Sequence, residues 1–235
     1  ELLYGRVAPY FATAAELDAL LAIAVPTSED VARLETLLTR VQQRRYFFSK
    51  LEHSGWVTPL AARGHFANPP ERIIHADGSW QMRAWPQGEY LARVAPHAPR
   101  VVAEQLMLVP VTLANPAVWG VVTDAALAVP VDLAARLASR IAKALATVPP
   151  VLLPHKAVDL VRRLADERDG AAWKLAEALL WCRPEGEAGT FAEVAAAGWS
   201  GDARLASAAF SRVEPYELSR LCKEARPALE RLDAE

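Results

Sequence analysis

Prolines and helix-capping residues divide the second half of the chain into short stretches. These regularly placed helix starts and ends constrain the fold more than any other feature. Seventeen prolines are spread over 235 residues. Proline fits the first turn of a helix but breaks its interior, so these prolines mark helix starts and helix ends. Between them, apolar residues recur with helical spacing, as at Leu133, Leu137 and Ile141. We therefore expect consecutive helices at residues 86–95, 99–109, 115–129, 130–147, 154–167 and 171–182.

Capping signals predict a helical hairpin near the start of the chain. Thr13 and Glu16 have the spacing of a capping box, and the helix that they open ends at Pro26. A second helix from Thr27 keeps an apolar period for about six turns, up to Ser54-Gly55. Because the joint is short, these two helices should lie antiparallel. Further helix starts are expected at Thr58, Thr190, Asp202 and Pro215.

Residues 44–90 interrupt this pattern with a dense group of aromatic residues and turn formers. Asp77-Gly78 stands between short apolar arms, which predicts a small β-hairpin. An isolated hairpin is marginal in water, so we expect it to lean on the helices through Trp80 and Trp85. The alternative is that both Trp side chains are partly exposed and form a docking surface. The aromatic residues expected in the core are Phe47, Phe48, Trp56, Phe66, Trp119, Trp173, Trp181 and Trp199.

Composition argues against several classes of protein. The net charge is −2 with both signs spread along the chain, so no field would attract a polyanion or an anionic membrane. No apolar run approaches the roughly 18–20 residues that span a bilayer. Cys182 and Cys222 sit at apolar positions of helical patterns, which favours core thiols in a reducing, cytoplasmic setting. The start lacks an initiator Met and the layout of a signal peptide, so we expect a piece of a longer polypeptide, and the excess of Arg over Lys suggests a bacterial source.

Motifs for chemistry are missing from the sequence. There is no G-x-S-x-G and no phosphate-binding glycine loop, and the histidines fall in joints or at helix ends. We therefore assign no catalytic, cofactor-binding or metal-binding residue. Two alternatives stay open: an enzyme whose carboxylates and histidines gather in a cleft near the connector, and a nucleic-acid binder. Glu52, His53, His65 and His75 could in principle hold a metal, but their spacing fits no metal-binding template such as H-E-x-x-H. Acidic residues close to Arg44-Arg45 and Arg162-Arg163 reduce the local positive charge of these arginine pairs. Nucleic acid is therefore the less favoured partner.

Two stretches resemble known protein modules. Residues 158–182 contain a helix, an Asp-Gly joint and a second helix, and residues 99–182 as a whole resemble degenerate HEAT-type repeats. The pattern F-F-x-x-L-x-x-x-x-W-x-x-P-L-x-x-x-G-x-F, which starts at Phe47, resembles a stretch found in large multidomain bacterial proteins. That second resemblance implies a middle module that links an effector or NTPase domain to a sensor, as in bacterial defence proteins.

These observations predict an all-α protein with three parts. Residues 1–66 form a helical hairpin and a short helix, residues 67–85 a Pro- and Trp-rich connector, and residues 86–235 an irregular solenoid-like stack of HEAT-like helix pairs. We expect a non-catalytic interaction or scaffolding module of a larger bacterial defence or signalling protein. Its partners would be protein domains of the same polypeptide or assembly, and it would need no cofactor. The interaction residues expected are Trp80, Trp85, Tyr90, Arg44 and Arg45.

Overall fold

The computed structural model describes residues 13–145, 153–180, 223 and 226–233. This part of the chain is all-α, with one small antiparallel β-hairpin. Residues 13–21 are helical. The elements that follow are α2 (Ser28–Leu37), α3 (Val41–Lys50), the 3-10 turn η1 (Ser54–Trp56), α4 (Val57–Ala62), β1 (Ile73–Ile74), β2 (Trp80–Gln81), α5 (Pro86–Val94), α6 (Pro99–Met107), α7 (Pro116–Ala128), α8 (Val131–Ala144), α9 (Leu153–Asp166), α10 (Ala171–Leu180) and α14 (Arg226–Asp233).

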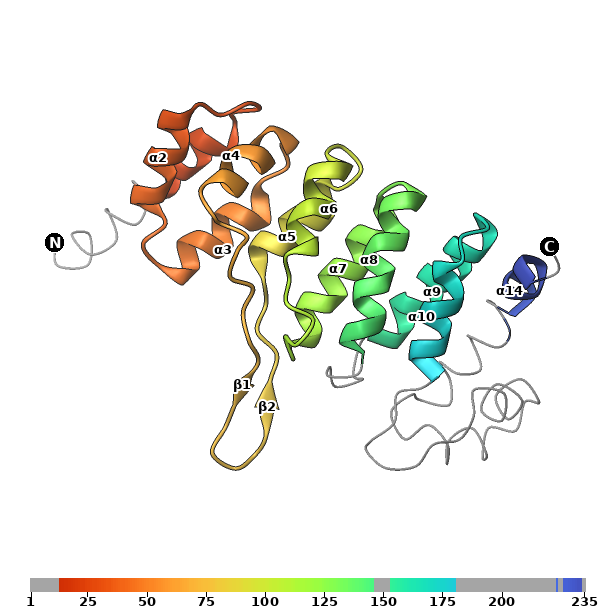
Figure 1. The fold of residues 1–235 in the computed structure, drawn as a ribbon. Coiled ribbons are helices and arrows are strands. Elements are labelled where there is room, and N and C mark those ends of the chain that lie inside the picture. The colour runs from red at the N-terminus through yellow and green to blue at the C-terminus, as the bar shows by residue number, and fades with distance from the viewer. Residues whose placement is uncertain (1–12, 146–152, 181–222, 224–225, 234–235) are drawn as a thin grey trace, which may run out of the picture.

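The helices form two layers. In one layer α3 packs on α5, α5 on α7, α7 on α9, and α9 on α14. In the other layer α4 packs on α6, α6 on α8, and α8 on α10. Pairs such as α7/α8 and α9/α10 connect the layers, and Figure 1 shows the stack running from α2 at one end to α14 at the other. The predicted all-α stack of helix pairs is confirmed.

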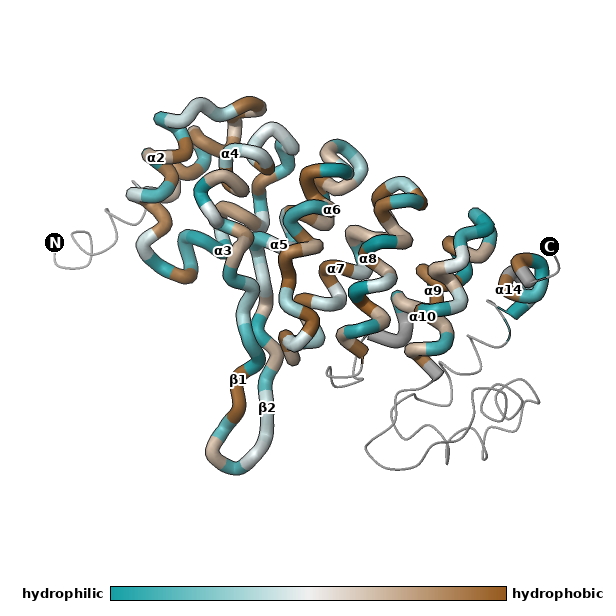
Figure 2. Tube along the Cα trace, viewed as in Figure 1, coloured by the Kyte–Doolittle hydropathy of each residue, from teal (hydrophilic) through white to brown (hydrophobic). Residues whose placement is uncertain are grey.

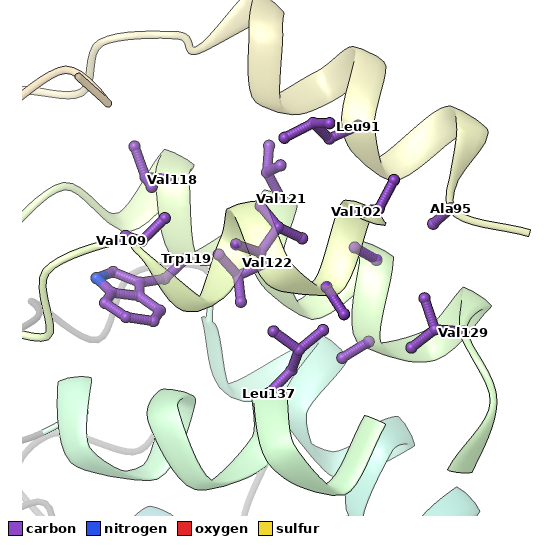
Figure 3. Close-up of a cluster of buried hydrophobic side chains, with 14 of the residues drawn as sticks. Leu91, Ala95, Val102, Val109, Val118, Trp119, Val121, Val122, Val129 and Leu137 are labelled. Atoms are coloured by element: carbon purple, nitrogen blue, oxygen red, sulfur yellow. The ribbon is translucent and has the colours of Figure 1, made fainter. Parts of the chain in front are cut away.

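Apolar stripes along the helices account for this packing. Figure 3 shows Leu91, Val102, Val122 and Leu137, which come from α5, α6, α7 and α8, meeting in one cluster. Each of these four side chains is fully buried. Burial of one such side chain contributes about 1.5–3 kcal/mol, so the spacing of apolar residues is sufficient reason for the helices to pair.

Helix α7 is buried on nearly all sides, as expected of a helix at the centre of a stack. Its buried polar groups are paired within the protein. The Thr123 hydroxyl donates to the Trp119 carbonyl at 2.8 Å, and the Trp119 indole N–H donates to the Leu113 carbonyl at 2.8 Å. Pairing of this kind removes the cost of placing a hydroxyl or an indole N–H in an apolar core.

Three arginines each connect two helices that are neighbours within the same layer. Each guanidinium donates to backbone carbonyls at the end of the preceding helix in its own layer, where helical carbonyls have no intrahelical partner. Arg93 of α5 reaches the end of α3, Arg140 of α8 the end of α6, and Arg163 of α9 the end of α7. The acceptors are the carbonyls of Phe48 (3.2 Å) and Leu51 (2.6 Å), of Val109, and of Ala126 (2.8 Å) and Val129 (2.6 Å).

The single long helix expected from Thr27 up to Ser54-Gly55 is wrong, because the chain forms two separate helices there. The capping box at Thr27 is present, with Asp30 as its partner. The first helix then ends at Leu37, and the second begins at Val41. The Gln43 side chain explains the break, since its oxygen accepts from the backbone N–H of Arg40 at 2.8 Å and creates a new helix start. Likewise α4 starts at Val57, one residue before the expected cap Thr58.

The six helices expected after residue 85 are confirmed to within a few residues at each end. The aromatic core is confirmed for Phe47, Phe48, Trp56, Phe66 and Trp119, which are at most 3% exposed, and Trp173 packs against it. Among the described helices, none has the length and apolar character needed to cross a membrane. Outside the described residues lie Trp181, Trp199, Cys182, Cys222 and the helix starts at Thr190, Asp202 and Pro215.

Candidate functional site

The β-hairpin is the feature that departs from the helical stack. Figure 1 shows β1 and β2 extending away from the helices into solvent. The expected Asp-Gly turn is confirmed, with Gly78 at φ 82°. The Asp77 carboxylate accepts from the Ser79 backbone N–H at 2.9 Å and from its hydroxyl at 2.6 Å, so the turn is closed by its own bonds. The expectation that the hairpin leans on the helices is therefore wrong for its tip.

A single asparagine fixes the base of the hairpin to the stack. Asn115 is 0% exposed and lies at the N-cap of α7, where its side-chain oxygen accepts from the Ala117 N–H at 3.3 Å. Its amide group donates to the carbonyls of Pro70 and Arg83, both at 2.8 Å. Pro70 precedes β1 and Arg83 follows β2, so one side chain holds both arms of the hairpin. The polar atoms of this buried amide are thereby satisfied.

Strand pairing divides the hairpin into two faces. Ile74 lies opposite Trp80, and Ile73 lies opposite Gln81. Residues directly opposite in an antiparallel pair share a face, and neighbours along a strand alternate between faces. The Arg72 guanidinium lies over the Trp80 ring, 5.6 Å from its centroid, which places Arg72 on the same side. We call Arg72, Ile74 and Trp80 the Trp80 face, and Ile73 with Gln81 the opposite face.

The hairpin exposes apolar side chains to solvent. Ile74 is 66% exposed and Ile73 39% exposed, and Trp80 is half-buried. Figure 2 shows the hydrophobic colour of β1 on a hairpin that is otherwise mainly hydrophilic. Among the described residues the other exposed large apolar side chains are Val25, Val41 and Leu108, which lie on other elements. The hairpin thus holds two adjacent members of this group.

Trp85 does not belong to this surface, in contrast to the alternative in which both Trp80 and Trp85 are partly exposed. It is 2% exposed and lies at the start of α5, where its ring packs directly on the backbone of Gly88. The absence of a Cβ at Gly88 makes room for the ring, so Trp85 anchors the root of the hairpin in the core. Partial exposure is confirmed for Trp80 and is wrong for Trp85.

Tyr90 is also part of the core. It is 0% exposed, stacks on Phe66 at 6.3 Å between centroids, and donates from its hydroxyl to the His53 carbonyl at 2.8 Å. Burial raises the pKa of the Tyr90 phenol well above its usual value. The side chain supports the aromatic segment from within the folded unit.

Arg44 and Arg45 are exposed on α3, a different element from the hairpin. Burial lowers the pKa of His65, and the positive charges of Arg44 and Arg63 lower it further, while Glu35 opposes this effect. Arg44 therefore faces a mixed group of charges. The other arginine pair is engaged within the protein, since Arg163 ties α9 to α7 and Arg162 lies 3.9 Å from Asp159.

The histidines do not converge on a cleft in the described part of the chain. His53, His75 and His97 are exposed, whereas His65 is half-buried, with its Nε2 3.4 Å from a Glu35 carboxylate oxygen. No group of three potential metal ligands occurs among the described residues. A small pocket of about 20 Å³ has room for roughly one water. It is lined by Thr13, Ala14, Leu17, Gln42, Gln43 and Tyr46.

Comparisons with protein-family models, with curated proteins and with the solved structures find no match for this chain. The projecting hairpin, fixed at its base and apolar on its strands, is therefore the feature on which a functional assignment rests.

Proposed function

We propose that this chain is a non-catalytic protein-binding module in which the helical stack is the support and the hairpin is the docking element. One observation carries the proposal: the hairpin extends into solvent with two isoleucines exposed, while a buried asparagine and a buried tryptophan hold its root. A two-stranded hairpin is marginal alone and gains stability when a partner covers it.

The side chains of the hairpin are of the types that anchor protein interfaces. Trp and Arg are enriched among residues that dominate binding energy, and exposed apolar surface next to polar residues marks interaction sites. Trp80 with Arg72 over its ring supplies the first kind of residue, and Ile74 supplies the second. Fixing the hairpin before binding reduces the entropy that association must overcome.

The stack itself fits a scaffolding role, and we infer that it is a degenerate repeat of the HEAT type. The support is the repeated contact of each helix with the next in its layer, together with the recurring arginine ties. Such stacks offer extended surfaces to other protein domains. Partner domains in the same polypeptide or assembly are the ones this architecture suits.

A trimmed variant tests the proposal. Replacing Ile73–Gln81 with Asn-Gly keeps Pro70 and Arg83 for the Asn115 clamp and removes the projecting strands. Peptides from a random phage-displayed library are selected on the full chain and made synthetically. We expect their affinity for the trimmed variant to fall by about tenfold or more, which corresponds to about 1.4 kcal/mol. Circular dichroism should show unchanged helicity. Peptides that bind both chains equally would contradict the role of the hairpin.

A further inference from the structure

The charges of the hairpin are sorted between its two faces. Extending the alternation of β1 back by two residues assigns Glu71 to the opposite face from Arg72. The other carboxylate of the hairpin, that of Asp77, accepts two hydrogen bonds from Ser79 in the turn. The Trp80 face therefore presents the Arg72 cation, while the Glu71 carboxylate falls on the opposite face and the Asp77 carboxylate is engaged within the turn.

The Arg72 side chain is oriented by its contact with Trp80. Its guanidinium lies over the Trp80 ring at 5.6 Å, and stacking of this kind restricts the rotation of a long side chain. No carboxylate of the described residues is ion-paired with it. A guanidinium that is already oriented presents its N–H groups as a fork that matches a carboxylate.

Ile74 adds apolar area beside this cation. It lies opposite Trp80 in the strand pair and is 66% exposed, so the face combines an aliphatic side chain, an aromatic ring and a positive charge. The apolar part of this surface is unfavourably exposed to water. A segment with apolar side chains and one negative charge would complement both the apolar area and the cation.

Resting on the proposed function, we propose that the Trp80 face binds a segment of a partner protein that carries apolar side chains and an Asp or Glu, and that this carboxylate pairs with Arg72. Nucleic acid fits the surface less well. Residues 71–83 contain two acidic residues, Glu71 and Asp77, and two basic residues, Arg72 and Arg83, so they offer no net attraction to a phosphate backbone.

Neighbouring isoleucines provide a matched test. Peptides are selected from a random phage-displayed library on the full chain, and their binding to single variants is measured by fluorescence anisotropy. Ile74→Ser and Arg72→Glu should each weaken binding by about tenfold or more. Ile73→Ser and Arg83→Glu, on the opposite face, should change it by less than about twofold. The selected peptides should contain Asp or Glu next to apolar residues, and changing that carboxylate to Lys should restore binding to Arg72→Glu.

The outcomes separate this inference from the proposed function. If trimming the hairpin abolishes binding but Ile74→Ser and Arg72→Glu do not, the hairpin docks partners and the assigned face is wrong. Equal losses of peptide affinity for Ile73→Ser and Ile74→Ser would also overturn the assignment of the Trp80 face. Selected peptides without carboxylates would overturn the proposed pairing with Arg72. Failure to enrich any peptide would count against both proposals. Thermal unfolding of each variant checks that the exposed substitutions leave the fold intact.

Discussion

Trp85 is buried because a glycine lies under its ring. A Cβ placed on Gly88 would lie 2.1 Å from Cε3 of Trp85, inside any permitted contact distance. Gly88 is in α5, and glycine lowers the stability of a helix. Its presence there is explained by the close contact with Trp85 that it permits. The ring that it accommodates fixes the segment that leads from β2 into the stack.

Alanine substitution of two helical glycines should therefore have opposite effects. Gly88→Ala should lower the free energy of unfolding by about 1–3 kcal/mol, because overpacking forces the Trp85 ring to move. Gly120→Ala in α7, where an added Cβ meets nothing within 4 Å, should raise it by about 0.5–1 kcal/mol. Chemical denaturation of both variants measures the pair. Stabilisation by Gly88→Ala would contradict the packing described for Trp85.

Sequence alone could not distinguish Trp80 from Trp85. Both lie in the same aromatic and proline-rich segment, and the local sequence around each is compatible with either a buried or an exposed side chain. Their difference depends on Gly88 in one case and on a projecting strand pair in the other, and both are properties of the tertiary structure. The burial of Phe47, Phe48 and Trp56 was predictable, because aromatic residues on helical spacing next to other apolar residues bury large areas.

At the scale of elements, the hairpin depends on the residue that caps α7. Asn115 caps that helix with its oxygen and holds the two arms of the hairpin with its amide group. A capping role is predictable from Asn115-Pro116, since asparagine is a preferred cap. Its bonds to Pro70 and Arg83 connect residues 45 and 32 positions apart, which no local pattern encodes.

Asn115→Ser should separate these two roles. Serine keeps a hydroxyl that can cap α7 but lacks the two donors for Pro70 and Arg83, so two carbonyls at the hairpin base lose their partner. We expect a loss of about 1–3 kcal/mol in stability, and faster hydrogen exchange of the β1 and β2 amides, with α7 amides unchanged. Thr112→Ala, at an exposed nearby position, is the control. Unchanged exchange in the hairpin would show that Asn115 does not hold it.

Helix ends were predictable where the signals were usual ones and not where an unusual residue, Arg40, stands at the N-cap. Proline starts α5, α6 and α7, and their bounds follow from it. The break between α2 and α3 depends on Gln43, whose side chain accepts from the Arg40 N–H and from the Thr39 hydroxyl at 3.0 Å. An apolar period that runs through residues 31–51 conceals such a break.

At the scale of the whole molecule, stability is distributed along the two layers. Each helix contacts its neighbours in the stack, so a local change should act on adjacent units first. The arginine ties lie at these joints. They connect residues 31 to 45 positions apart, and no local pattern in the sequence predicts them, because an arginine on a helix is usually solvent-exposed.

Removing one tie should loosen one joint. Arg163→Met keeps most of the aliphatic length but loses the donors to the Ala126 and Val129 carbonyls at the end of α7. We expect the free energy of unfolding to fall by about 1.5–3 kcal/mol, since these bonds involve a charged donor. Arg136→Met, exposed on α8, should change it by less than about 0.5 kcal/mol. Equal effects of the two substitutions in urea denaturation would contradict the role given to Arg163.

Partners should dock on the hairpin while the helical stack keeps its structure. Hydrogen exchange of the full chain, measured with and without a selected peptide at saturating concentration, tests this most directly. We expect added protection confined to residues 71–83, with the exchange of α5 to α10 unchanged. Protection that falls on the helices of the stack and leaves residues 71–83 unchanged would contradict it.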